Sequence, residues 1–150
     1  MPKVARKLPE KICSAIKAVS GSNGDYICGN LQGALPAISL VSQSALISAF
    51  SNDMAADMVF AQQVYGYGKA GDCFIGLSTS GNAKNVLYAA QVAKAMGLKT
   101  IGFTGQSGGA LKGVCDVCIC VPSASTPRIQ EYHLPVYHTL CMMVEEAFFG

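Results

Sequence analysis

Five short apolar runs, separated by segments with helical periodicity, constrain the fold of this chain more than any other feature. The runs are "YIC", "PAISL", "CFIGL", "KTIGF" and "VCICV", at residues 26–28, 36–40, 73–77, 99–103 and 117–121. The last four are continuously apolar, which is typical of strands buried on both faces of a parallel sheet. Apolar residues at helical spacing predict helices at residues 7–20, 42–49, 54–67, 83–96, 107–113 and 127–149. This alternation predicts an α/β fold, a three-layer sandwich with a mainly five-stranded parallel sheet.

The composition suits one small domain that assembles with copies of itself. Hydrophobic residues make up 51% of the 150 residues, and charged residues make up 13%, against about 25% in an average soluble domain. We expect this apolar surplus to be buried between subunits. A net charge of +2 gives no reason to expect a nucleic acid or a membrane as a partner. Residues 1–11 contain no apolar signal core, and seven cysteines without one predict a reduced, cytoplasmic protein.

A row of hydroxyl side chains follows the third apolar run, in "GLSTSGNAKNV" at residues 76–86. Open α/β sheets bind ligands at the carboxyl ends of their strands, which is where this loop is expected. The helix predicted at 83–96 would direct its free N–H groups and its positive dipole end at the loop. Gly81 would let a ligand approach the backbone. The hydroxyl donors are Ser78, Thr79 and Ser80. Together these features predict a phosphate site that needs no lysine.

Two features of the chain also have purely structural explanations. Ser80 or Asn82 could simply cap the helix predicted at 83–96, which is the alternative to a phosphate site. A C-x2-C-x-C spacing is compatible with a metal site. Its residues are Cys115, Cys118 and Cys120. Because the chain offers no second cysteine pair beside them, we interpret these three as small buried apolar residues.

Three motifs resemble the sugar isomerase (SIS) domain family: "GLSTSGNAKNV", "FTGQSGG" at 103–109 and "RIQEYHLPVYH" at 128–138. A fourth, "SNDMAADMVFAQQV" at 51–64, resembles the phosphoheptose isomerase branch of that family. The resemblance covers nearly all of residues 31–150. It implies a flavodoxin-like parallel sheet and a homotetramer with active sites between subunits. It also implies interconversion of sedoheptulose 7-phosphate and glycero-manno-heptose 7-phosphate by proton transfer between C1 and C2. Several members of the family bind zinc, so Zn²⁺ is the cofactor that the resemblance implies.

The resemblance also assigns roles by position. The residues that match the family's phosphate-binding loop are Ser78, Thr79 and Ser80. The positions that match its sugar contacts are Asn30, Asn52 and Asp53. Gln130 and His138 match the reacting end, as catalytic residues and as metal ligands. The proton transfer needs a base near the carbon and an acid near the oxygens, and a neutral imidazole can be either near pH 7.

The two residues at the reacting end cannot easily meet at one ion. Gln130 and His138 are eight residues apart, which is about 12 Å of helix rise. Either Gln130 lies on an irregular first turn of its helix, or the two residues belong to the sites of different subunits. Pro135 lies inside this helix and is expected to kink it. His133 matches no site position of the family and is the less favoured of the two histidines.

The chain departs from the family in two places. Ala83 stands where the family often has serine, which removes one hydroxyl from the phosphate site. More seriously, the family continues after a Gly-Asn pair with a helix that carries a histidine and a glutamate. That glutamate is its catalytic base, and both residues are metal ligands. Here "ICGN" at 27–30 runs directly into "LQGALPAISL" at 31–40, and no other acid obviously replaces the glutamate.

We therefore expect that a segment of the family is missing from this single domain between Cys28 and Ala34, near residues 30 and 31. Parallel neighbours at 26–28 and 36–40 would need a connection of a dozen or more residues. Only the seven residues from Gly29 to Leu35 are available, and when fully extended they span about 25 Å. A continuous chain would force the first strand into an antiparallel or displaced position.

Two functions remain open on the sequence. The first is an aldose-ketose phosphate isomerase that acts on a heptose 7-phosphate. The second is a non-catalytic SIS domain that binds a sugar phosphate or a protein partner, like the initiator-associating proteins that resemble this branch. The presence or absence of the glutamate-bearing helix discriminates between them. If the protein lacks this helix, the binding function is favoured, because no base would remain for the proton transfer.

Overall fold

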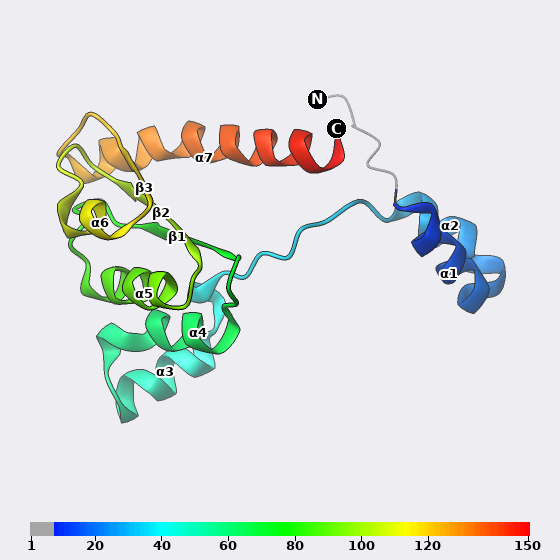
Figure 1. The fold of residues 1–150 in the computed structure, drawn as a ribbon, viewed down its shortest axis with the longest axis horizontal. Helices are drawn as coiled ribbons and strands as arrows, with labels where there is room; N and C mark the ends of the chain where they lie inside the picture. The colour runs from blue at the N-terminus through cyan, green and yellow to red at the C-terminus, as the bar shows by residue number, and fades with distance from the viewer. Residues whose placement is uncertain (1–7) are drawn as a thin grey trace. The chain divides into compact units, whose positions relative to one another are not determined.

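The computed structural model describes residues 8–150 and divides the chain into two compact units (Figure 1). One unit comprises residues 38–137, and the other comprises the chain up to residue 37 together with 138–150. The first residue of the helix expected at 7–20 lies outside the described residues.

The larger unit is built on a three-stranded parallel sheet with the order β1-β2-β3. Its strands are β1 (Cys73–Leu77), β2 (Lys99–Thr104) and β3 (Val117–Cys120). The register aligns Leu77 with Phe103 and Phe103 with Ile119, so the carboxyl ends of all three strands meet at one edge of the sheet. The α/β class, the parallel sheet and its last three predicted strands are confirmed.

Helices connect the strands of the larger unit close to the predicted positions. They are α3 (Ser44–Asp53), α4 (Val59–Tyr67), α5 (Lys84–Ala95), α6 (Gly109–Val114) and α7 (Thr126–Phe149), which continues into the smaller unit. Two single turns of 3-10 helix, η2 (Leu40–Ser42) and η3 (Ala56–Met58), precede α3 and α4. Pro127 lies in the first turn of α7, where its missing N–H and fixed φ cost nothing. No helix among residues 8–150 is long and apolar enough to cross a membrane.

One face of the sheet is covered by α5, with α4 packed behind it. The core here contains Phe74 of β1 and Leu98, which are nearly buried. Three alanines of α5 are completely buried and allow the helix to approach its neighbours closely: Ala89, Ala90 and Ala93. Small side chains at contact positions shorten the distance between packed helices. This face of α5 therefore serves packing.

The other face of the sheet is covered only in part. Phe103 of β2 is 1% exposed, because His133 and the buried Ile129 of α7 lie over this part of the sheet. Figure 1 shows α5 and the first turns of α7 on opposite sides of the sheet, which gives the larger unit three layers. Ile75, Leu77 and Val117 on this second face are about half exposed, at 54%, 51% and 54%.

The two strands predicted at 26–28 and 36–40 are wrong, so the described sheet has three strands instead of five. Residues 26–28 lie inside α2 (Gly24–Asn30), and residues 31–39 form no helix or strand. The physical reason is the short connection, since seven residues cannot form the helical crossover that a parallel pair needs. The first segment is displaced into a helix, as a continuous chain would require.

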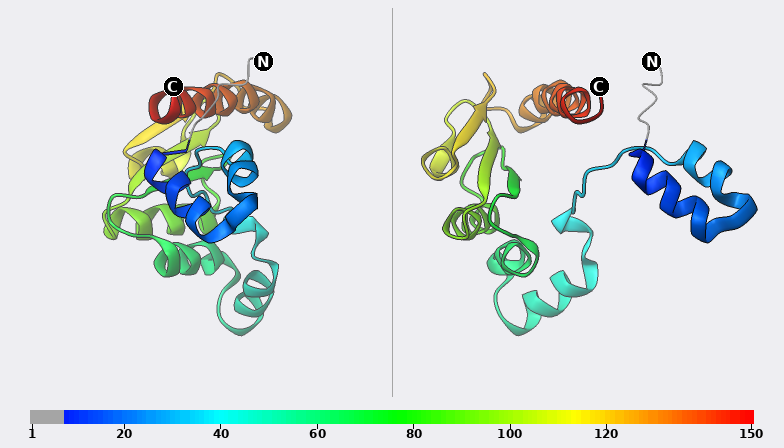
Figure 2. Two further views of the ribbon diagram at one scale, coloured as in Figure 1. Left: turned by 90° about the vertical axis from the view of Figure 1, so that its right-hand side faces the viewer. Right: turned by 45° about the vertical axis from the view of Figure 1, so that its right-hand side comes forward.

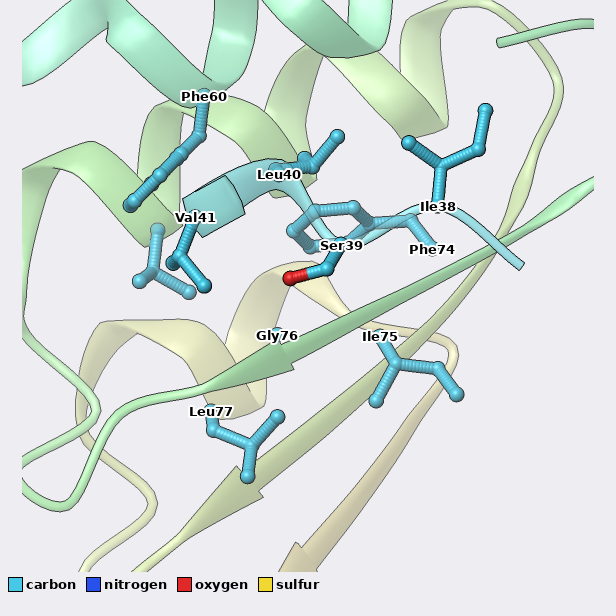
Figure 3. A pocket seen from close by; sticks show the side chains of 10 residues that line it. Ile38, Ser39, Leu40, Val41, Phe60, Phe74, Ile75, Gly76 and Leu77 are labelled. Atoms are coloured by element: carbon cyan, nitrogen blue, oxygen red, sulfur yellow. The ribbon is translucent and has the colours of Figure 1, made fainter. Parts of the chain in front are cut away.

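As a result β1 keeps a free edge. Residues 38–41 pass over this strand without pairing with it (Figure 3), and a cavity of about 330 Å³ remains between them. The cavity wall is apolar, with Ile38, Phe60 and Phe74 among its residues. The apolar segment predicted as a strand at 36–40 thus lies beside β1 but has not entered the sheet.

The smaller unit begins with a helical hairpin, which Figure 2 shows as two helices folded back on each other. Its elements are α1 (Glu10–Ser20), the single turn η1 (Gly21–Asn23) and α2. Gly24 lies so close to Lys17 of α1 that a Cβ would come within 2.8 Å of the Lys17 Cα. An ion pair of 2.6 Å joins Lys17 to Asp25, but both side chains are exposed, so it contributes little to stability.

Candidate functional site

The hydroxyl-rich loop forms a tight turn at the carboxyl end of β1. The Ser78 N–H donates to the Phe103 carbonyl at 2.9 Å, which continues the pairing of β1 with β2 by one residue. The Gly81 N–H then donates to the Ser78 carbonyl at 2.9 Å and closes the turn. Ser78 is buried, Thr79 is half-buried and Ser80 is exposed. The three hydroxyls thus line a path from the sheet edge to the surface.

This turn is interlocked with the start of α6. Gly81 has a φ of +69°, which favours glycine, and a Cβ at this position would overlap the Gly108 carbonyl. The Leu111 N–H donates to the Gly81 carbonyl at 2.9 Å, and the Ala110 N–H donates to Asn82 Oδ1 at 2.9 Å. Two backbone segments therefore touch where no side chain fits between them, and this contact fixes the turn.

The N-terminus of α5 begins beside this turn and has no side-chain cap. Ala83 is its N-cap residue and offers no oxygen. Asn82 uses its amide on α6 and on the Ser80 carbonyl, while Ser80 Oγ accepts from the Asn82 N–H at 3.1 Å. The capping explanation for these two residues is therefore wrong. The first turn of α5 contains no acid, and Lys84 opens it, so the positive end of the helix is left for an anion.

The loops that follow β2 and β3 meet the turn at the same edge of the sheet. The Gly105 N–H donates to the Thr79 carbonyl at 2.9 Å, and the Gln106 N–H donates to the Ser123 carbonyl at 3.0 Å. Gly105 is enclosed, because a Cβ there would lie 2.5 Å from Ile129 Cδ1 and 2.8 Å from the Ser123 oxygen. We call residues 78–84, with Gly105 behind them, the phosphate loop, after the ligand that the sequence predicts for them.

The other predicted site residues lie on several elements of the two units. Asn52 and Asp53 are the last two residues of α3 and are exposed, and no hydrogen bond between described residues joins them to the serines. Asn30 ends α2, where its Nδ2 donates to the Tyr26 carbonyl at 2.7 Å. Asn30 and His138 belong to the smaller unit, whereas Gln130 is an exposed residue of the larger one.

The donors expected for zinc do not form a metal site within the described residues. Helix α7 runs unbroken from Thr126, so Gln130 does not lie on an irregular first turn. A zinc site commonly joins four His, Cys, Asp or Glu ligands. No group of three or more such side chains gathers among residues 8–150. Gln130 and His138 supply one amide and one imidazole, and this donor set does not fit zinc without further ligands.

The triad of nearby cysteines behaves as the apolar interpretation predicts. Cys115 is buried, Cys118 and Cys120 are half-buried, and all three are free thiols. The Cys120 Sγ lies 3.7 Å from Cys118 Sγ, and the Thr104 hydroxyl donates to Cys120 Sγ at 3.3 Å. Burial raises the pKa of the Cys118 thiol, so it stays neutral as a packed apolar residue would.

Sequence reasoning missed three residues that hold the loops in place. Asn82 bridges the phosphate loop to α6, and His133 is buried at the end of β2 with its Nε2 3.1 Å from the Thr104 carbonyl. Asp116 fastens the opposite end of the sheet by accepting from the N–H and hydroxyl of Thr100 at 2.9 and 3.0 Å. Of these three roles, only that of His133 left a signal in the sequence, because a histidine between apolar residues is expected to be buried.

Comparisons with known proteins show which family the chain resembles. A family model described as "SIS domain" matches residues 26–105. A phosphoheptose isomerase of a Nitratiruptor species is 42% identical over 151 residues, covering 96% of this chain and 81% of that protein. One from Leptospira biflexa serovar Patoc is 45% identical over 125 residues, covering 83% of this chain and 64% of that protein.

Solved structures of similar proteins extend the agreement to the fold. The phosphoheptose isomerase GmhA from Neisseria gonorrhoeae superposes with a TM-score of 0.73 at 36% identity, covering 75% of this chain and 62% of that chain. A phosphoheptose isomerase from Francisella tularensis gives the same score and identity and is covered over 63% of its length. The chain thus spans less than two thirds of both solved proteins. It belongs to the SIS domain family, and within that family to the phosphoheptose isomerases.

Proposed function

We propose that this chain is a cytoplasmic phosphoheptose isomerase that interconverts sedoheptulose 7-phosphate and glycero-manno-heptose 7-phosphate. The observation that carries the proposal is the phosphate loop, in a chain 42% identical over 96% of its length to a phosphoheptose isomerase. The seven free thiols are in keeping with a reducing compartment.

The phosphate loop is suited to the phosphate end of such a sugar. A helix N-terminus offers unpaired N–H groups and roughly half an elementary positive charge to an anion. Ser78, Thr79 and Ser80 place hydroxyls beside the N-terminus of α5. Hydrogen bonds to a charged acceptor contribute about 1.5–3 kcal/mol each. The loop would therefore supply most of the binding energy at a distance from the reacting carbons.

The proton transfer falls to groups of the chain that can titrate or hold oxygens. We assign His138 the role of acid or base and Gln130 that of a hydrogen-bond partner for the sugar oxygens. A neutral imidazole is the group best suited to exchange a proton near pH 7. The glutamate that is the family's base has no counterpart near residues 30 and 31, so no further residue of this chain is assigned as the base at the carbon. Zinc, if this protein binds it, would need ligands beyond Gln130 and His138, because the described residues do not fit a zinc site.

We further propose a homotetramer in which α7 lies in an interface and Gln130 and His138 serve different subunits. Large apolar side chains exposed on α7 support this, among them Leu134 at 48% and Met143 at 61%. The half-exposed Ile75 and Leu77 on the open sheet face support it as well. Isolated exposed apolar residues are normal, but a helix with several of them is typical of a subunit contact.

A non-catalytic sugar-phosphate-binding module is the second candidate. It is favoured by the composition of residues 26–52, which contain no acid. An isomerase reaction without a base at the carbon would be slowed by about 10²–10⁴-fold. In this second candidate function the phosphate loop still binds the sugar phosphate, but no isomerisation takes place.

An assay of the intact protein on sedoheptulose 7-phosphate, with and without a chelator, decides between the two. The proposal predicts turnover that falls when Ser80→Ala weakens phosphate binding, while Ser48→Ala, an exposed serine of α3, leaves it unchanged. Binding of the sugar phosphate without turnover supports the binding module. If Ser80→Ala and wild type bind the sugar phosphate with equal affinity, the loop is not part of the binding site.

A further inference from the structure

His133 is buried in the first half of α7, with 3% of its surface exposed. Its Nε2 lies 3.1 Å from the carbonyl oxygen of Thr104, the last residue of β2. A carbonyl oxygen can only accept, so Nε2 must carry the hydrogen and donate it. The ring also meets Phe103 edge to face, with centroids 5.5 Å apart and planes at 87°. These two contacts hold the imidazole in one orientation.

The carbonyl that accepts from His133 belongs to the same peptide group that supports the phosphate loop. The peptide bond between Thr104 and Gly105 is planar, so its C=O and N–H move together. The C=O accepts from His133 and also from the Val121 N–H at 3.0 Å, and the N–H donates to the Thr79 carbonyl at 2.9 Å. A rotation of this one plane would break all three bonds at once. His133 and Thr79 are therefore connected through a single rigid group.

The surroundings of Gly105 make this connection stiff. Its position is closed by Ile129, Ser123 and Thr79, each within 2.9 Å of where a Cβ would stand. Hydrogen bonds in series also polarise one another inside a protein. Donation by His133 to the carbonyl makes the Gly105 N–H a better donor to Thr79. The imidazole touches no open space in the loop and acts only through this peptide.

We propose that His133 is a positioning residue for the phosphate loop. Together with the Val121 N–H, its Nε2–H holds the Thr104–Gly105 peptide in the orientation that presents the Gly105 N–H to Thr79, and so keeps the turn in its anion-binding shape. The inference rests on the proposed function, since it concerns how the same loop binds its sugar phosphate. We assign His133 no catalytic role, because its ring is buried and contacts Thr104 and Phe103.

A purely structural role predicts different behaviour. If His133 only fills space between α7 and the sheet, an aromatic ring of similar size should replace it. His133→Phe keeps the packing against Phe103 but removes the donor. His133→Gln loses part of the packing but keeps an amide N–H that can reach the Thr104 carbonyl. The proposal therefore predicts that glutamine rescues phosphate binding and phenylalanine does not.

The experiment measures the affinity of the intact protein for inorganic phosphate and for sedoheptulose 7-phosphate by calorimetry. His133→Phe should weaken both by about tenfold, which corresponds to the loss of one hydrogen bond. His133→Gln should stay within about threefold of wild type. Val64→Ala, a buried change in α4, is the control for general destabilisation and should bind normally. In turnover, His133→Phe should raise KM and leave kcat nearly unchanged, since phosphate binding is shared by ground and transition states.

Hydrogen exchange at the Gly105 amide gives a readout that does not depend on the ligand. The exchange should accelerate in His133→Phe and stay slow in His133→Gln and Val64→Ala. Normal phosphate affinity together with slow exchange in His133→Phe would overturn the inference. So would a loss of phosphate affinity in Val64→Ala as large as the loss in His133→Phe. If wild type binds neither phosphate nor the sugar phosphate, the proposed function fails, while the exchange measurement still decides the role of His133. Should His133→Phe not fold, His133→Asn, whose amide stops short of the Thr104 carbonyl, takes its place with the same expectations.

Discussion

Replacing Gly81 by alanine tests whether the contact between the two glycine-containing loops builds the phosphate loop. Gly81 has a φ of +69°, and its carbonyl accepts from the Leu111 N–H at 2.9 Å. A Cβ would overlap the Gly108 carbonyl and lie 2.6 Å from its carbon. Both obstacles are backbone atoms, so no side chain can turn aside to make room. The two loops would have to separate.

The cost of this separation follows from its parts. Alanine in the left-handed region costs about 1–2 kcal/mol relative to glycine. The lost or lengthened hydrogen bond to Leu111 costs about 1 kcal/mol more. With the steric displacement, we expect a destabilisation of about 2–4 kcal/mol, at the upper end of ordinary single substitutions. For a chain of this size that corresponds to a fall in Tm of about 5–15 °C.

Thermal unfolding followed by circular dichroism measures this shift, and a phosphate titration accompanies it. Gly113→Ala is the matched control, because Gly113 lies in α6 without a positive φ, and a Cβ added there would have no atom within 4 Å. We expect it to be neutral or to raise stability by up to about 1 kcal/mol. If Gly81→Ala unfolds within about 2 °C of wild type and binds phosphate equally well, the loop contact is not what shapes the site.

Three further changes test other parts of the structure. Gln63 is 1% exposed and its Oε1 has no hydrogen-bond partner among the described residues. Gln63→Met should therefore raise the free energy of unfolding, measured by urea titration, by about 1 kcal/mol. A lower free energy of unfolding would show that the oxygen has a partner. The pKa of Asp116 is lowered, chiefly by the Thr100 N–H, so its contribution is full above the ordinary carboxyl pKa and is lost as pH falls through the lowered value. Asp116→Asn should therefore flatten the decline of stability below about pH 4, and an unchanged decline would contradict this. His138→Ala should abolish isomerase activity, because the imidazole is the group assigned to exchange the proton; retained turnover would remove His138 from the mechanism.

The sequence predicted the larger unit well because its patterns are local. Continuous apolar runs at 73–77 and 99–103 became β1 and β2, and the periodic segment at 83–96 became α5. The loop between β1 and α5 could be placed because a strand-to-helix turn at the carboxyl edge of a parallel sheet follows from topology alone.

The two wrong strands have one physical cause. The runs at 26–28 and 36–40 have strand propensity, but two parallel neighbours need a connection of a dozen or more residues, and only Gly29 to Leu35 are available. Residues 26–28 became part of α2, and residues 38–41 pass beside β1 without entering the sheet, so β1 keeps its free edge. The role of His133 was missed for another reason. Its partner is a backbone carbonyl 29 residues away, and a carbonyl has no identity in the sequence.

The central claim is that the turn from Ser78 to Lys84 binds the phosphate of a heptose phosphate. Calorimetric titration of the intact protein with sedoheptulose 7-phosphate and with unphosphorylated sedoheptulose tests it most directly. Losing one charge-assisted hydrogen bond costs about 1.5–3 kcal/mol. We therefore predict that the phosphorylated sugar binds at least about tenfold more tightly, and that Ser80→Ala narrows this difference. Equal affinity for the two sugars, or a preference for the unphosphorylated one, would contradict the account.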